Sequence, residues 1–252
     1  MGREPPLAED GGSPALRFSL RYLPDDRSEV AGIRATILEA EPRVSRWGAF
    51  RRAVTIQILP DHEALEAAVG RHGYPWLRAW AFGDQILLQS PRTWDRGRPL
   101  QELLVHELTH ALMYQLLQPD DVPFGEEPPP WFREGMASVT AGQEQLGLTE
   151  LRQFRDQHPG ADLLRPSGEL YRTEKEAVYG AAHRAFELLV ELCGERAVRD
   201  VLRGVRSGAR FADAFAMATG YALESFEAKA VSSGFSATAF QGPVPATGAG
   251  GP

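Results

Sequence analysis

Two histidines four residues apart, His106 and His110, lie inside the long apolar segment 100–118, with Glu107 between them. The segment ends before a proline and is long enough to predict a largely buried helix. On a helix, residues four apart lie about 40° from each other around the axis, so both imidazoles point the same way, with the carboxylate beside them. Polar groups in a buried helix are costly unless they are paired or bind a metal.

These residues form the sequence H-E-x-x-H, and two imidazoles one turn apart can bind one Zn²⁺ at about 2.0–2.1 Å. Glu107 lies close enough to reach a water activated by such an ion without being a ligand, which predicts a general base. A plainer interpretation stays open, in which both histidines are core residues with hydrogen-bond partners. The single cysteine, Cys193, rules out a thiolate site, so a metal needs His and carboxylate ligands.

A catalytic zinc ion needs a third protein ligand and an open fourth position. We expect this ligand to be Glu134, which lies on a second predicted helix, Trp131 to Ala141, after three prolines. The small neighbours Gly135 and Ala137 would let this helix approach the first one closely. The two histidines and Glu134 are therefore predicted to bind one zinc ion.

Other assignments of these residues remain open. Glu134 can instead be an ordinary solvated glutamate of a surface helix. Glu126 and Glu127 are rival ligands, but they lie in a proline-rich loop that would hold them less rigidly. If a fourth protein ligand closed the site, the ion would only fasten two helices together.

A strand-rich first half followed by a helical second half predicts an α+β fold. Residues 16–235 are expected to form one domain between flexible tails at 1–15 and 236–252, because the tails lack a periodic apolar pattern. Further strands and helices follow from alternating and helical apolar periods. The strands are expected at 16–22, 54–59, 79–82 and 85–89, and the helices at 26–41, 61–69, 177–193, 195–206, 211–218 and 222–232.

With Glu134 as the third ligand, the sequence resembles the gluzincin group of metallopeptidases, and more narrowly the peptidase MA-like family. The resemblance implies a zincin-like fold, with an N-terminal mixed β-sheet lobe that carries the active-site helix and a C-terminal helical lobe. It also implies a zinc metallopeptidase that acts on a peptide or protein substrate. Besides the histidine motif, it rests on Ile58-Leu59-Pro60-Asp61, Gln85 to Ser90, Trp131-Phe132-x-Glu134-Gly135-x-Ala137, Tyr179 and Ala218-Thr219-Gly220-Tyr221, within about residues 16–232.

The sequence also departs from better-known relatives. Met113 and Leu116 stand where the metzincin extension needs glycine and histidine, which excludes that class. The segment G-x-M-E-N of the large zinc aminopeptidases is absent. Ser138 stands where thermolysin-like enzymes often carry an aspartate that orients a zinc histidine, so the sequence leaves the partner of that histidine unidentified.

The resemblance implies a tyrosine or histidine of the helical lobe that stabilises the oxyanion. Tyr179 and His183 lie four apart on one predicted helical face, and both are candidates. Tyr179 also fits a core stripe with Phe186 and Val190. The resemblance also implies that the strand at 85–89 forms the sheet edge above the zinc helix, where an extended peptide can add by backbone hydrogen bonds, although an ordinary sheet strand has the same pattern.

Charge and hydropathy exclude other classes of partner. The chain has 27 basic and 34 acidic residues and a net charge of −7, without a basic cluster, which argues against nucleic-acid binding. No apolar run of about 18 residues predicts a membrane span, and we expect a cytoplasmic protein. The oligomeric state stays open. Two other functions also remain: a zinc hydrolase of another amide or ester, and a non-catalytic zinc-binding module.

Overall fold

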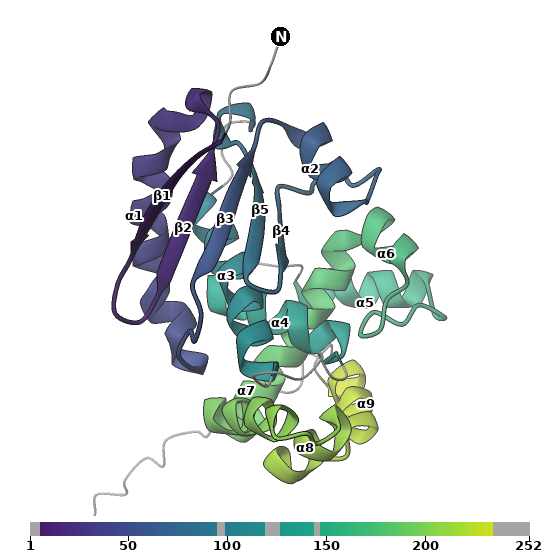
Figure 1. Cartoon of the computed structure of the whole chain (residues 1–252). Coiled ribbons are helices and arrows are strands. Elements are labelled where there is room, and N and C mark those ends of the chain that lie inside the picture. Colours follow the sequence, from purple (N-terminus) through teal and green to yellow (C-terminus); the bar gives the residue numbers. More distant parts are fainter. Residues whose placement is uncertain (1–5, 95–98, 119–126, 144–146, 234–252) are drawn as a thin grey trace, which may run out of the picture.

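The first half of the chain contains a five-stranded mixed sheet (Figure 1). The computed structural model describes residues 6–94, 99–118, 127–143 and 147–233. The three central strands run parallel, and each outer strand runs antiparallel to its neighbour. In sheet order the strands are β1 (Leu7–Gly12), β2 (Arg17–Tyr22), β3 (Val54–Leu59), β5 (Gln85–Gln89) and β4 (Ala79–Phe82).

Strand β1 lies within residues 1–15, so the prediction of a flexible tail there is wrong for residues 7–12. The whole strand pairs with β2, and Glu9 accepts a hydrogen bond of 2.6 Å from the Tyr22 hydroxyl. An edge strand can be held by backbone hydrogen bonds with little burial of its side chains. Its sequence therefore carries no apolar alternation by which it could be recognised.

One face of the sheet carries the main core. Ile56 of β3 and Ile86 of β5 are fully buried there. They belong to one cluster with residues of α1 (Arg27–Val44) and α3 (Leu100–Leu117), which cover this face. The alternation of buried and half-buried residues along β3 follows from the two-residue period of a strand. This packing fixes α3, the helix of the histidine motif, against the sheet.

The opposite face packs against α2 (His62–Val69), and the side chain of its N-cap, Asp61, accepts a hydrogen bond from the Ala64 N–H. Trp80 of β4 and Leu87 of β5 contact this smaller cluster. Strand β4, and not β5, is the edge of the sheet, so the prediction that residues 85–89 form the edge is wrong. Because β5 pairs in parallel with β3, its hairpin partner β4 is left on the outside.

Helix α1 continues through Pro42, where the sequence predicted that it would stop. A proline inside a helix leaves the carbonyl four residues earlier without its usual donor. That carbonyl belongs to Leu38, which is 39% exposed, so solvent can reach this part of the helix. The proline is tolerated because it lies in the last turn and on the exposed side.

The second half of the chain is helical, as predicted. Helices α5 (Leu148–Gln157) and α6 (Gly168–Thr173) had no sequence prediction, and α7 (Lys175–Arg206) contains one break at Gly194, at φ 75°, where the sequence predicted a helix end. Gly194 therefore separates two helical segments that continue each other. The helices are α4 (Pro130–Ala141), α5 (Leu148–Gln157), α6 (Gly168–Thr173), α7 (Lys175–Arg206), α8 (Phe211–Thr219) and α9 (Leu223–Ser233), and short 3₁₀ helices lie at Pro24–Asp26, Ser45–Trp47 and Pro91–Thr93.

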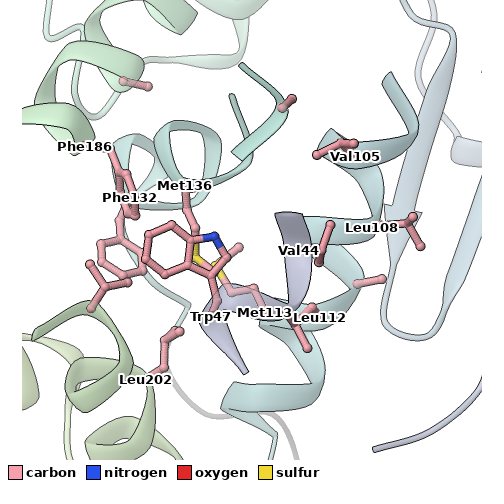
Figure 2. Packing of buried hydrophobic residues seen from close by; sticks show 14 of the residues in the cluster. Val44, Trp47, Val105, Leu108, Leu112, Met113, Phe132, Met136, Phe186 and Leu202 are labelled. Carbon is pink, nitrogen blue, oxygen red and sulfur yellow. The ribbon is translucent and has the colours of Figure 1, made fainter. Parts of the chain in front are cut away.

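Trp47 packs where the two halves meet (Figure 2). Its ring contacts Phe186 of α7 edge to face, with centroids 5.6 Å apart, and its indole N–H donates to Thr140 Oγ1 of α4 at 2.7 Å. Figure 2 shows Met113 of α3 and Met136 of α4 beside the same indole. One buried cluster includes residues of both halves, so α3 and α4 are held against each other by a shared core.

Gly135 allows a close approach, but to a different helix from the one predicted. A Cβ atom at this position would lie 2.3 Å from the Ala182 carbonyl oxygen and 2.5 Å from Phe186 Cβ, both in α7. Although α4 also packs against α3, Gly135 itself faces α7, so the interpretation that this glycine faces the first helix is wrong.

Replacing Gly135 by alanine is expected to lower the free energy of unfolding by about 1–3 kcal/mol, because the helices must move apart. Chemical denaturation measures this change. Gly32→Ala is the matched control, since nothing lies within 4 Å of a Cβ there, and alanine in this exposed helix should add up to about 1 kcal/mol. Equal loss of stability in both variants would contradict the close contact with α7.

Among the helices that the structure describes, none combines the length and the apolar character that crossing a bilayer requires. The predicted tail at 236–252 lies outside the described residues.

Candidate metal centre

Side chains of α3 and α4 converge on one point. The Nε2 atoms of His106 and His110, one turn apart on α3, are 3.1 Å from each other. Glu134 of α4 places its Oε2 atom 3.5 Å from Nε2 of His106 and 3.4 Å from Nε2 of His110. Within the part of the chain that the structure describes, these residues form the one group that offers three grouped metal-ligand atoms.

The three atoms fit a tetrahedral ion. Ligands about 2.0–2.1 Å from zinc at tetrahedral angles are about 3.4 Å from one another. The three distances here are 3.1, 3.4 and 3.5 Å. In addition, Oε2 of Glu134 is buried and has no hydrogen-bond partner among the described residues. A buried carboxylate oxygen without a partner is costly, and a cation at this point would satisfy it.

Charges within the group are strongly coupled. Burial raises the pKa of Glu134, but the positive charges of His110 and His106 outweigh this and hold the pKa well below its usual range. Burial lowers the pKa of His106, while its interactions with Glu134 and with the charge of Glu107 more than compensate and raise it. Glu134 is therefore kept as a carboxylate, the protonation state in which it can bind a metal.

Glu107 lies beside the three residues and is only 7% exposed. Burial raises the pKa of its carboxyl group, and the positive charges of His106 and His110 oppose that effect. The nearby backbone N–H of Ala81, in strand β4, also opposes the rise of this pKa. The carboxylate is therefore placed between the candidate ligands and the edge of the sheet.

Gln143 is a hydrogen-bond partner of His106 that the sequence did not identify. Its Oε1 atom accepts a hydrogen bond of 2.9 Å from Nδ1 of His106. A proton held on Nδ1 leaves the Nε2 lone pair facing the other ligands, which is the tautomer that a metal site needs. Gln143 follows the end of α4 and carries no signal of this role in the sequence. Only the return of the chain toward α3 brings it into contact.

Ser138, which stands where thermolysin-like enzymes often carry the orienting aspartate, contacts His183, which is not one of the candidate ligands. Its hydroxyl lies 3.0 Å from Nδ1 of His183 on α7, and Nε2 of His183 lies 3.3 Å from Glu187. His183 therefore takes part in a polar bridge between α4 and α7. It is not among the described residues that line the cleft, which favours Tyr179 over His183 as the candidate for the oxyanion.

Tyr179 lies beside the ligands. Its ring centroid is 6.2 Å from that of His106, and burial together with the charge of Glu134 raises its pKa well above the usual value, so the phenol keeps its proton. Tyr171 of α6 packs against it, with centroids 6.0 Å apart. Sequence reasoning missed Tyr171, because α6 itself was not predicted.

The rival ligands are placed differently. Glu127 accepts a hydrogen bond from Arg133. The side chain of Glu127 is 55% exposed, so it is turned toward solvent. Glu126 lies outside the described residues.

A cleft of about 650 Å³ opens above the group and gives access to it. Residues of β4, of α3 and of the start of α7, among them Tyr179, line this cleft. Its lining includes His106, Glu107, His110, Glu134, Gln143 and Tyr179. The fold and the site thus define a mixed α+β protein with a candidate two-histidine, one-glutamate metal centre that an external molecule can reach.

Comparisons with known proteins agree with this class at the level of the fold. A crystal structure of a two-domain M1 zinc metallopeptidase, a mutant bound to L-arginine, is similar over 90% of this chain and 51% of that chain, with a TM-score of 0.50 and 13% sequence identity. An aminopeptidase N family protein from Idiomarina loihiensis covers 89% of this chain and 41% of its own, with a TM-score of 0.37 and 15% identity. The present chain spans about half the length of these proteins, or less.

No protein-family model matches the sequence, and no curated protein is significantly similar to it. At 13% identity the first likeness supports a shared fold over most of the chain, and the second, at its lower TM-score, adds no argument.

Proposed function

We propose that this chain is a zinc metallopeptidase of the gluzincin type, with one zinc ion held by His106, His110 and Glu134. The observation that carries the proposal is the triangle of ligand atoms at 3.1, 3.4 and 3.5 Å, one of them a buried carboxylate oxygen without a hydrogen-bond partner. The likeness in fold to a zinc metallopeptidase adds support. In this proposal, the sheet half and the helical half correspond to the two lobes of a zincin-like fold.

The open access to the centre favours a catalytic role over a purely structural one. Three candidate ligands are grouped in the described part of the chain, and they line a cleft. A structural zinc site is closed by four protein ligands, whereas a catalytic one keeps a position open. Glu107 adds a carboxylate that lines the same cleft and is not needed as a ligand.

The residues have separate tasks in hydrolysis. When bound, the zinc ion supplies a Lewis acid that polarises the scissile carbonyl and makes a water more acidic. Glu107 takes the proton from the attacking water and then gives it to the leaving amine, since its raised pKa suits both directions of transfer. Tyr179, protonated and beside His106, donates a hydrogen bond to the developing oxyanion. Gln143 orients His106.

The edge of the sheet provides a place for an extended peptide. Strand β4 is the last strand of the sheet and lines the cleft. A peptide can add to such an edge by backbone hydrogen bonds. The proximity of the Ala81 N–H to Glu107 places the middle of this strand beside the proposed base. A peptide along β4 would thus present a backbone carbonyl to the metal centre.

A peptide-library digest tests the proposal. The zinc-loaded protein is expected to cleave peptides of a mixed library, and the same protein treated with a chelator is expected to leave them intact, with products identified by mass spectrometry. A zinc-loaded protein that cleaves no peptide would overturn the peptidase assignment. It would leave a hydrolase of another amide or ester, or a non-catalytic zinc module, as the remaining explanations of the site.

A further inference from the structure

Strand β4 presents its side chains to two different surroundings. Ala79 and Ala81 face the main core, whereas Trp80 packs in the smaller cluster beside α2. This follows from the two-residue period of a strand. A peptide strand added at the edge of β4 would have the same alternation, so every second substrate side chain would lie on the Trp80 side.

Arg71 covers that side of the strand. Its guanidinium carbon lies 4.6 Å from the centroid of the Trp80 ring, a favourable stacking of a cation on an aromatic face. Arg71 follows Gly70, whose left-handed conformation at φ 65° ends α2. The backbone N–H of Arg71 donates a hydrogen bond of 3.1 Å to the Glu66 carbonyl. Both interactions hold Arg71 over the cleft, which it lines.

Other cations of the cleft are already engaged. Arg133 pairs with Glu127, Lys175 lies 3.5 Å from Glu176, and Arg78 donates to the Pro75 and Leu77 carbonyls. For Arg71, no ion pair occurs with any residue that the structure describes. A cation without an acidic partner at the rim of a cleft attracts anionic groups.

The distance along the strand fixes where an acidic group would lie. Glu107 and Ala81 line the same cleft, and α3, which carries Glu107, packs against β4, so the bond that Glu107 helps to hydrolyse lies opposite this part of β4. The substrate residue opposite Trp80 is then next to the cleaved bond. Side chains opposite each other on adjacent strands have Cβ atoms about 4.5–5.5 Å apart. An aspartate or glutamate there reaches a guanidinium stacked on the neighbouring ring.

We propose that Arg71, held on Trp80, is a specificity-determining residue that selects substrates with an acidic side chain next to the cleaved bond. This inference rests on the proposed peptidase function, because it takes the course of the peptide along β4 from it. The substrate class is therefore an acidic peptide, recognised by a charge-assisted hydrogen bond to a planar guanidinium.

Matched peptides measure this preference. A cleaved peptide from the library is prepared with glutamate, glutamine or lysine at each position flanking the cleaved bond, and kcat/KM is determined for each. At one of these positions, glutamate is expected to exceed glutamine by about tenfold, the usual effect of one charge-assisted hydrogen bond. In Arg71→Gln this ratio is expected to fall to near one, and in Arg71→Glu the lysine peptide should become the preferred one.

Ratios within one variant do not depend on how much of the protein is folded or zinc-loaded. Arg43→Gln removes the same charge from an exposed position of α1, and it should keep the parental ratio. A second readout uses the zinc-loaded Glu107→Gln protein with the same peptides, whose binding is followed by titration calorimetry. The glutamate peptide is expected to bind more tightly than the glutamine peptide, and Arg71→Gln should abolish this difference.

The outcomes separate the two proposals. Cleavage without any preference for glutamate, or a preference that survives in Arg71→Gln, would overturn the role of Arg71 and leave the peptidase in place. An absence of cleavage would remove the peptidase and, with it, the acidic subsite, because the course of the peptide along β4 is taken from that function. Equal binding of the glutamate and glutamine peptides in the binding titration would overturn the acidic subsite as well.

Discussion

Glu107→Gln is expected to lower kcat for peptide hydrolysis by about 10²–10⁴-fold, the usual contribution of a positioned general base. The amide has the size of the carboxylate, but it cannot accept the proton of the attacking water. Because Glu107 is not among the grouped ligand atoms, the variant should still bind one zinc ion per chain. Steady-state kinetics and elemental analysis of the same sample measure both properties.

The control for this change lies on the same helix. Glu102→Gln alters a carboxylate in the first turn of α3, outside the cleft lining, and should keep the parental kcat. Hydrolysis by Glu107→Gln at the parental rate would exclude Glu107 as the base. Loss of zinc from that variant would instead show that Glu107 is needed to hold the metal, against the geometry of the other three side chains.

Local sequence patterns were sufficient for the elements that carry the candidate ligands. The apolar composition of α3 and the prolines and glycine that bound α4 are visible without any tertiary contact, and both helices occur where they were predicted. The common point of the two histidines on α3 follows from helix geometry alone. The placement of Glu134 beside them needed the crossing of two helices, which the sequence indicated only through the need for a third ligand and the small residues next to Glu134.

What the sequence did not predict depends on contacts between distant segments. Strand β1 is held by pairing and carries no apolar period. The choice of β4 as the edge is set by the parallel pairing of β5 with β3, which no pattern inside residues 85–89 encodes. Gln143 became the partner of His106 because the chain turns back after α4. Gly135 correctly indicated a close helix contact, but the sequence could not name α7 as the partner.

Zinc is expected to raise the melting temperature of the protein by about 10 °C, and Glu134→Gln should remove most of that increase. A ligand present at about 1,000 times its dissociation constant stabilises the folded state by about 4 kcal/mol. In a protein of this size each kcal/mol shifts the melting temperature by about 2–4 °C. Differential scanning fluorimetry of the chelated and zinc-loaded forms of each protein measures the two increments.

The increment, and not the melting temperature itself, reports on the ligand. Glutamine at position 134 keeps the volume of the side chain but loses its negative charge. In the parental protein, the two imidazoles keep the Glu134 side chain ionised. The variant can therefore change the stability of the metal-free protein in either direction, while its response to zinc must shrink.

Gln143→Ala provides the graded comparison: it keeps all three ligands but removes the acceptor for His106, and should weaken zinc affinity by only about 10–100-fold. An equal zinc response in the parental protein and in Glu134→Gln would mean that the ion binds without this carboxylate. The two helices would then not share one metal, and the hydrolytic mechanism would lose its basis.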